Sequence, residues 1–311
     1  MNLIKKQVRK KMDSIHQEQY SRKFDSLYKR RGKSRVLFII MFMIFLIFAI
    51  SFIFPFLWIL LNSFKPAGEF AENFSGWPSY LTFENFIQAF TYKDVSTKNF
   101  TIFQMLGMSI LIAGVGTIVT VFVSSCAAYV LAKYKFPGRS VIFAIVIFSL
   151  IVPIVGALPS QIQLMRAMGL DGTVIGCIFI YSGGFGANFL LLYSFFKSLS
   201  WTYVEAARID GASDFRIFFQ IIIPMAKGPM IAISIIQLIG LWNDYLTPSI
   251  YLPNYPTIAV GLKYLSDSMI SKANYTMLFA TIILTLLPIV LIFCFFSKTI
   301  MENTSVGGLK G

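Results

Sequence analysis

Long apolar runs that contain no charged residue dominate the chain. Five of them exceed the roughly 20 residues that an α-helix needs to cross about 30 Å of hydrocarbon, and they lie at 36–64, 99–132, 140–165, 172–196 and 274–297. A sixth run, 228–243, reaches that length only with flanking residues such as Tyr245, Leu246 and Ile250. The pattern predicts an all-α, polytopic membrane protein with six transmembrane helices, at about residues 36–62, 106–132, 141–164, 173–196, 228–250 and 276–297.

The composition of the 311 residues agrees with this class of protein. Hydrophobic residues make up 56% of the chain and charged residues 13%, and the charged share is about half of what a soluble domain carries. None of the six runs alternates between apolar and polar residues, and each is longer than a barrel strand of ~10 residues. Helices are therefore favoured over a transmembrane β-barrel.

The charges predict the orientation of the chain. The net charge is +13, and residues 1–35 contain 12 Lys and Arg against three acidic residues. When successive loops are assigned to alternate sides, one side has 21 Lys and Arg and the other has six. The positive-inside rule then places both termini in the cytoplasm. This gives a basic cytoplasmic tail at 1–35, a six-span domain at 36–299 and a cytoplasmic C-terminal tail at 300–311.

The basic tail has two interpretations. A nucleic-acid partner would need a recognisable binding fold, and the tail shows none. A segment that follows the positive-inside rule and contacts anionic membrane lipid needs only its Lys and Arg residues. We therefore expect a lipid contact and no nucleic-acid partner.

Residues for catalysis or metal binding are scarce. The only histidine is His16, in the tail, and Cys126, Cys177 and Cys294 lie in three different predicted spans. The phosphate-binding pattern G-x-x-x-x-G-K-[ST] is absent from the sequence. We therefore expect no enzymatic activity, no metal site and no cofactor bound by this chain.

Prolines predict bends in the spans. Pro153 and Pro159 interrupt the third span, Pro224 precedes the fifth and Pro288 lies inside the sixth. Because a proline removes one backbone hydrogen bond, each of these positions is predicted to bend its helix.

The loop at 197–227, between the fourth and fifth spans, predicts two short helices around a glycine. Thr202 and Glu205 have the spacing of a capping box, and Gly211 is placed to end the first helix in a left-handed conformation. Ser213 with Asp214 can cap the second helix. Such a loop suits a cytoplasmic docking element, and an ordinary interfacial elbow is the alternative.

This loop resembles the EAA motif of bacterial ABC importer permeases, which reads E-A-A-x3-G-x9-I-x-L-P. The matching residues are Glu205, Ala206, Ala207, Gly211, Ile221 and Pro224. The departure is Ile223, where the motif has Leu. Further segments resemble carbohydrate-uptake permeases of the maltose-transporter type, namely 63–66, 128–139, 168–171, 205–213, 242–245 and 307–311.

The resemblance implies a permease that forms half of a translocation pore in the bacterial cytoplasmic membrane. Its partners would be a second homologous permease subunit, an ABC ATPase dimer that uses ATP and Mg²⁺, and an extracytoplasmic solute-binding protein. The substrate would be a sugar or oligosaccharide. The 197–227 loop would form a coupling helix, in which Glu205 and the two alanines contact the ATPase and Gly211 forms the tight turn.

Polar and aromatic residues in the spans are candidates for the substrate path. Sugars are held by hydrogen bonds and aromatic stacking, so Gln237, Trp242, Asn243 and Tyr245 are the candidate lining residues, with packing between helices as the alternative role.

Other transporter classes remain as alternatives. A peptide or amino-acid ABC permease is the nearest one, although the 242–245 and 307–311 segments favour a sugar. An ion-coupled secondary transporter would require ionisable coupling residues within the membrane and internal repeats, and the sequence shows neither.

Overall fold

The computed structural model describes residues 31–151, 154–183 and 185–304, and within these ranges every regular element is helical. Residues 1–30 of the basic tail, Pro153 and residues 305–311 lie outside the described residues. The chain divides into two compact units, Met1–Ile59 and Leu60–Gly311, which are described separately.

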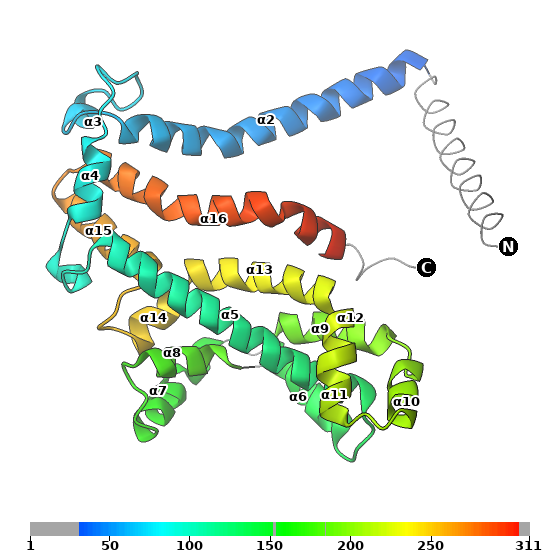
Figure 1. Ribbon diagram of the computed structural model, residues 1–311. Coiled ribbons are helices and arrows are strands. Elements are labelled where there is room, and N and C mark those ends of the chain that lie inside the picture. Colours follow the sequence, from blue (N-terminus) through cyan, green and yellow to red (C-terminus); the bar gives the residue numbers. More distant parts are fainter. Residues whose placement is uncertain (1–30, 152–153, 184, 305–311) are drawn as a thin grey trace. The chain divides into compact units, whose positions relative to one another are not determined.

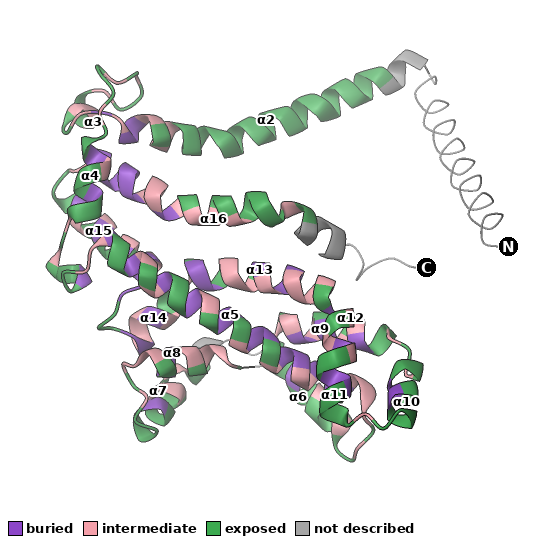
Figure 2. Ribbon diagram, viewed as in Figure 1, coloured by how far each residue is buried: buried purple, intermediate pink, exposed green. Residues whose placement is uncertain are grey.

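The described part of the first unit is a single helix. It belongs to α2 (Arg31–Ser63), which continues through Pro55 without a break. Residues 35–63 are long and apolar enough to cross a membrane. Exposed apolar residues follow one another along the helix, and Figure 2 colours almost all of its described length as exposed. A helix that is hydrophobic on all sides suits lipid or a protein interior.

The second unit is built around α5 (Ile102–Lys133), which Figure 1 shows passing between the other helices. Its first turn is fixed by a capping box, in which Thr101 Oγ1 accepts from Gln104 N at 3.4 Å and Gln104 Oε1 accepts from Thr101 N at 2.9 Å. Helices α8, α9, α13 and α15 pack along α5. The remaining α-helices of this unit are α3 (Glu69–Glu72), α4 (Glu84–Thr91), α6 (Arg139–Ile151), α7 (Leu158–Ala167), α8 (Val174–Tyr181), α9 (Ala187–Ser198), α10 (Thr202–Ile209), α11 (Asp214–Ile217), α12 (Ile223–Met225), α13 (Lys227–Asn243), α14 (Leu246–Tyr251), α15 (Ile258–Ser271) and α16 (Tyr275–Thr304). Short helical turns at η1 (Val95–Thr97), η2 (Ile154–Ala157) and η3 (Phe218–Ile222) complete it.

Three of the helices, α2, α5 and α16, are individually long and apolar enough to cross a membrane. A fourth crossing results if α11–α12 and α13, which meet at 76°, are counted as one bent span. These figures rest on length and composition within the described residues, so the six-span topology and the cytoplasmic position of the termini stay predictions.

Three of the predicted spans are not single helices. The 141–164 segment is divided between α6 and α7, and the 173–196 segment between α8 and α9. The 228–250 segment is divided between α13 and α14. Proline and glycine explain the first two interruptions, because Pro159 lies in the first turn of α7 and Gly183 and Gly186 lie between α8 and α9.

Two of the prolines have different effects on their helices. Close to Pro224 the chain turns by 76° between α12 and α13, as predicted. Pro288, in contrast, lies inside α16, which continues on both sides of it.

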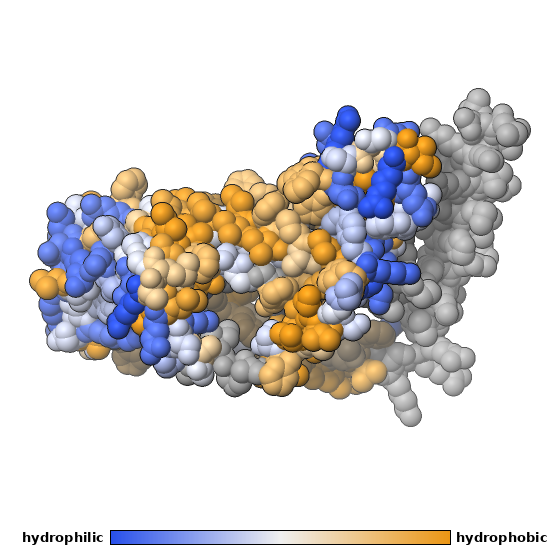
Figure 3. All heavy atoms as spheres, turned by 90° about the horizontal axis from the view of Figure 1, so that it is seen from below, coloured by the Kyte–Doolittle hydropathy of each residue, from blue (hydrophilic) through white to orange (hydrophobic). Residues whose placement is uncertain are grey.

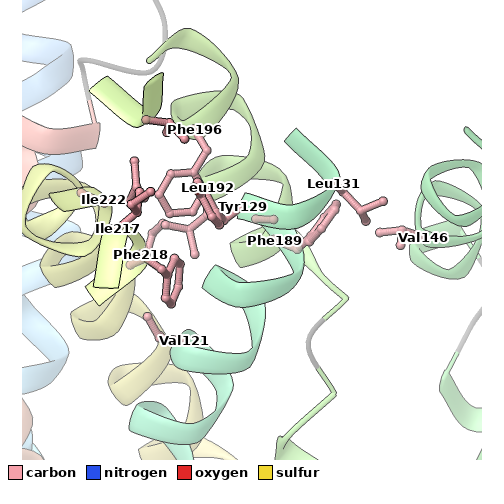
Figure 4. Packing of buried hydrophobic residues seen from close by; sticks show 14 of the residues in the cluster. Val121, Tyr129, Leu131, Val146, Phe189, Leu192, Phe196, Ile217, Phe218 and Ile222 are labelled. Carbon is pink, nitrogen blue, oxygen red and sulfur yellow. The ribbon is translucent and has the colours of Figure 1, made fainter. Parts of the chain in front are cut away.

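Buried apolar residues form two main clusters at opposite ends of α5. One lies where the last turns of α5 meet α9 and α11–η3, and it includes Tyr129, Leu192, Phe196, Ile217 and Phe218, which converge in Figure 4. The other lies where the first turns of α5 meet α13, α15 and α16. On the face in Figure 3, apolar side chains cover the middle and hydrophilic side chains gather toward both ends, the distribution expected for a segment that crosses a bilayer.

Candidate functional site

Helix α10 ends at the predicted glycine. Gly211 has a φ of 76°, in the left-handed region. The N–H of Gly211 donates to the carbonyl of Arg208 at 3.0 Å, and the N–H of Ala212 donates to the carbonyl of Ala207 at 2.9 Å. These bonds satisfy carbonyls that the end of the helix would otherwise leave unpaired. The prediction of a helix terminated by Gly211 is therefore confirmed.

The predicted capping box at the start of α10 is wrong. The helix begins one residue earlier than a Thr202 cap requires, with Trp201 as the N-cap and no side-chain cap hydrogen bond. The Thr202 hydroxyl lies 2.9 Å from Ser200 Oγ instead. The Glu205 carboxylate has no hydrogen-bond partner among the described residues and is exposed. It is thus available to a partner protein.

The second helix of the loop begins as predicted and then changes its winding. Ser213 Oγ accepts from Arg216 N at 3.4 Å and caps α11. A π-helical turn follows at η3, where Ile223 N donates to the carbonyl of Phe218. Pro224 contributes to the interruption, because it has no N–H for the carbonyl four residues before it. The loop therefore joins α13 through a wide turn and a sharp bend, a geometry often found at functional sites.

Helix α10 has a buried face and an exposed face. Val204 and Ala207 are buried in the cluster around Tyr129. Tyr203 is half exposed, and Ile209 is 87% exposed. A hollow of about 470 Å³ lies beside the helix and is lined by Ser200, Thr202, Tyr203, Ala206, Ala207, Asp210 and Ile221.

The structure thus gathers most of the motif residues at one place. Ala206, Ala207 and Ile221 share the hollow. Glu205 lies on the exposed part of the same helix, and Gly211 forms its end. Pro224 lies apart from them, at the bend before α13.

Four residues that the motif does not include hold the loop together. The Arg208 guanidinium lies 5.6 Å from the ring centre of Trp201 and 6.0 Å from that of Tyr134. It donates to Asp214 Oδ1 at 2.8 Å, and the Tyr134 hydroxyl donates to the same oxygen at 3.1 Å. The hydrogen bond from Arg208 lowers the pKa of Asp214, and the same bond raises the pKa of Arg208. We name these four residues the Arg208 clamp.

Sequence reasoning missed the Arg208 clamp because its members come from separate parts of the chain. Tyr134 follows α5, whereas Trp201, Arg208 and Asp214 belong to the loop. The only local signal is the placement of Trp201 and Arg208 seven residues apart, which puts them on one side of a helix.

Three of the four candidate lining residues lie together. Trp242, Asn243 and Tyr245 line a groove of about 390 Å³, and the rest of its wall is made by residues of α15 and α16. Trp242 is buried and Tyr245 is half exposed. Lys263, Ser266 and Thr285 provide most of the other polar groups of the wall. The groove thus combines aromatic surface with a few hydrogen-bonding groups, which is the mixture that sugar binding uses.

Gln237, the fourth candidate, is not at this groove. Its Oε1 accepts from Asn188 Nδ2 at 2.6 Å, which joins α13 to α9. Packing between helices, the alternative role of the candidate set, therefore fits Gln237 best.

A partly buried tyrosine joins two of the helix breaks. Tyr181, the last residue of α8, donates to Asp244 Oδ2 at 2.9 Å, and Asp244 Oδ1 accepts from Thr247 N at 3.1 Å. The Tyr181 carbonyl accepts from Thr120 Oγ1 of α5 at 2.7 Å. Sequence reasoning missed this contact, because it depends on where α8 and α13 end.

Within the part of the chain that the structure describes, no three or more His, Cys, Asp or Glu residues come together in a way that could hold a metal ion. Cys126, Cys177 and Cys294 are free cysteines.

Comparison with known proteins gives consistent results. The profile of a family described as "Binding-protein-dependent transport system inner membrane component" matches residues 124–300. The diacetylchitobiose uptake system permease protein NgcG of Streptomyces coelicolor is 32% identical over 269 residues, which cover 85% of this chain and 86% of that protein. The arabinooligosaccharides transport system permease protein AraQ of Bacillus subtilis is 30% identical over 86% of this chain and 94% of its own length.

A solved structure shares the fold. One chain in the crystal structure of a bacterial ABC transporter involved in the import of the acidic polysaccharide alginate superposes with a TM-score of 0.68. The match covers 86% of this chain and 98% of that chain, at 22% sequence identity.

Proposed function

The chain belongs to the family of binding-protein-dependent transport system inner membrane components, and we propose that its 197–227 loop is the surface through which a separate ATPase drives it. It is a permease subunit of a bacterial ABC importer for a sugar or oligosaccharide, and ATP hydrolysis in such a system belongs to another subunit. It is an integral membrane protein.

The two-faced geometry of α10 carries this proposal. One face is fixed in the core by Val204 and Ala207, while Tyr203, Glu205 and Ile209 on the remaining surface are exposed. Ile209 is 87% exposed, and a single exposed apolar side chain is common on protein surfaces and indicates nothing by itself. Here it lies next to a carboxylate and a shallow hollow, which together suit a protein partner.

The connection of α10 to the spans suggests how force is transmitted. We propose that closure of an ABC ATPase dimer on ATP and Mg²⁺ displaces α10. The displacement reaches α13 through the Gly211 turn, the π-helical turn and the bend near Pro224. Buried Ile217 and Ile222 keep the loop packed on α5 and α9 while it moves.

The remaining assignments follow from the family. We propose that the chain pairs with a second homologous permease and receives its sugar from an extracytoplasmic solute-binding protein. Residues 36–299 would form the six-span domain in the bacterial cytoplasmic membrane, with residues 1–35 and 300–311 in the cytoplasm. We further propose that the groove beside Trp242, Asn243 and Tyr245 is part of the sugar path.

An exposed alanine on α10 tests the docking surface without disturbing the core. We expect Ala206→Arg to reduce the amount of ATPase retained on washed membranes by tenfold or more, because a long side chain would fill the hollow. Glu205→Ala should weaken retention less. The membranes would contain the complete transporter with its ATPase, and uptake of labelled diacetylchitobiose and arabino-oligosaccharides would be measured in parallel.

The matched control is Ala167→Arg, at an exposed alanine that ends α7. It should leave ATPase retention unchanged. If Ala206→Arg and Glu205→Ala both retain the ATPase and transport at wild-type rates, the assignment of this loop as the coupling surface is wrong.

A further inference from the structure

The Arg208 clamp joins parts of the chain that the coupling motif does not connect. Trp201 and Arg208 lie at the two ends of α10, Asp214 begins α11, and Tyr134 is the C-cap of α5. The rings of Trp201 and Tyr134 are 5.8 Å apart and nearly perpendicular, at 87°. The guanidinium of Arg208 is within cation–π distance of both rings.

The clamp also closes the turn at Gly211. Arg208 and Asp214 lie on opposite sides of this glycine, and the bond between Nη2 and Oδ1 is 2.8 Å. A glycine turn alone is permissive. With Asp214 accepting from Arg208 and from Tyr134 at the same oxygen, α10, α11 and the end of α5 share one charged hydrogen-bonding centre.

This arrangement provides a second connection from α10 to the spans. The covalent route leads from α10 through α11 to α13, whereas the route through Tyr134 leads directly to α5. A second contact also joins this loop to the end of α5, because the Lys133 ammonium donates to the carbonyl of Leu199, shortly before α10. Helix α5 also packs on α8, α9, α13 and α15, so a displacement delivered to α5 reaches most of the second unit.

We propose that Arg208 is a positioning residue that locks the coupling helix to the end of α5, so that a displacement of α10 by the ATPase moves α5 together with α13. The inference rests on the proposed function of the 197–227 loop. It assigns to Arg208 a role in transmitting movement that is separate from ATPase docking.

The chemistry of arginine makes this role specific. The side chains of Arg208 and Asp214 are 45% and 58% exposed, and an exposed ion pair is weak by itself. The planar guanidinium, however, contacts two rings while it donates to Asp214. A lysine would keep the charge but would lose the fork geometry and the planar stacking. Arg208→Lys is therefore expected to restore only part of the function that Arg208→Ala removes.

The experiment compares transport with hydrolysis in membranes that contain the complete transporter and its solute-binding protein. Three quantities are measured: ATPase retention, ATP hydrolysis, and uptake of labelled diacetylchitobiose or arabino-oligosaccharide, whichever the wild type carries. For Arg208→Ala we expect retention within twofold of wild type, continued hydrolysis, and about tenfold less sugar carried per ATP. For Arg208→Lys we expect an amount of sugar carried per ATP between those of the wild type and Arg208→Ala.

The matched control is Arg216→Ala. Arg216 is exposed on the same loop, and its Nε donates to Gln220 within the same helical segment at 2.9 Å. It should leave the ratio of sugar to ATP unchanged. Tyr134→Phe is the milder variant of the clamp, because it removes one hydrogen bond to Asp214 and keeps the ring; we expect it to lower the ratio about two- to threefold.

Two outcomes overturn the inference. Loss of ATPase retention in Arg208→Ala would make Arg208 a docking residue, and an unchanged ratio of sugar to ATP in Arg208→Ala would show that the clamp transmits nothing. If Arg208→Ala does not accumulate in the membrane, Tyr134→Phe and Arg208→Lys decide by the same criteria. Ala206→Arg, measured in parallel, distinguishes failure of this inference from failure of the proposed function. Normal ATPase retention and normal uptake in Ala206→Arg would overturn the coupling surface itself.

Discussion

The first and last turns of α5 pack against their neighbours in different ways. Near its start, directional hydrogen bonds fix the surrounding elements. Ser109 Oγ accepts from Ile258 N at 2.7 Å, and Asn85 Nδ2 donates to the carbonyls of Ser63 and Lys65 at 2.9 Å and 2.7 Å. Near its end, Tyr129 packs against the rings of Phe196 and Phe218, with ring centres 5.8 Å and 5.1 Å apart.

The difference indicates how the elements at each end respond when α5 is displaced. Hydrogen bonds weaken steeply when their geometry is distorted, so elements joined by buried ones move as one body. Hydrophobic attraction is non-directional, and aromatic surfaces tolerate small shifts. The elements near α15 therefore suit a group that moves as one body with α5, and the aromatic packing near α10 suits a joint that adjusts while the Arg208 clamp holds α10 to α5.

The largest expected effect comes from the same substitution at the two ends of α5. Ser109→Ala leaves the N–H of Ile258 buried without a partner and should lower the free energy of unfolding by about 1–3 kcal/mol. Ser125 is also buried, but its hydroxyl donates to the Val121 carbonyl of its own helix. Ser125→Ala should therefore cost less than about 0.5 kcal/mol. Thermal unfolding in detergent measures both variants, and equal losses would contradict the comparison.

A second pair separates the functions of the two ends. Tyr203 beside the coupling surface and Tyr245 at the groove are 51% and 48% exposed. An aromatic contact contributes about 0.5–1.5 kcal/mol, which corresponds to at most about tenfold in binding. We expect Tyr203→Ala to lower ATPase retention by up to about tenfold. Tyr245→Ala should lower sugar uptake to a similar extent while retention stays normal.

The control for this pair is Tyr80→Ala, at an exposed tyrosine outside both sites. It should change neither measurement. A loss of ATPase retention in Tyr245→Ala, or a loss of uptake in Tyr203→Ala without a loss of retention, would show that the two ends do not divide the work in this way.

The smallest expected effect depends on pH. The carboxylate of Asp94 accepts from the hydroxyl and N–H of Ser96, from Ser268 Oγ at 2.8 Å and from Lys272 Nζ at 3.2 Å. These bonds, those from Ser96 first, hold the pKa of Asp94 well below its ordinary value of 3.8. Because the native pKa is lowered, the stabilisation is complete above the ordinary pKa and is lost as the pH falls through the native value.

Asp94→Asn should therefore cost about 1 kcal/mol of unfolding free energy at pH 7, and the difference from wild type should shrink below about pH 4. Asp267→Asn is the control, because Asp267 is exposed and its ion pair with Lys263 contributes little. Unfolding midpoints in detergent between pH 7 and pH 3.5 measure both. A difference that grows on acidification would contradict the assignment.

Sequence patterns predicted the features that depend on neighbouring residues. Uncharged runs predicted α2, α5 and α16, because helices of this length need only apolar composition. Gly211 predicted the end of α10, and Ser213 predicted the cap of α11. The EAA motif predicted which loop would carry the exposed helix, and the residues at 242–245 predicted one wall of the groove.

The same patterns could not predict where a helix stops within an apolar run. No charged residue marks a break within 173–196, and the glycines at 183 and 186 are compatible with either a continuous helix or the observed interruption, in which α8 ends at Tyr181 and α9 begins at Ala187. The capping box at Thr202 failed for a related reason. Trp201 is the N-cap of α10 and packs against Tyr134, and a sequence pattern contains no information about that contact.

The sequence by itself determined the class of protein, the family and the position of the loop that we propose as the coupling surface, because long apolar runs and a short motif are local properties of the chain. Only the tertiary structure decided that Gln237 bonds Asn188 away from the groove, and that Asp214 binds Arg208 and Tyr134 together. Residues separated by 49 and 80 positions meet in these contacts. Their partners are set by the helix breaks and by packing on α5, which involve residues distant in the chain.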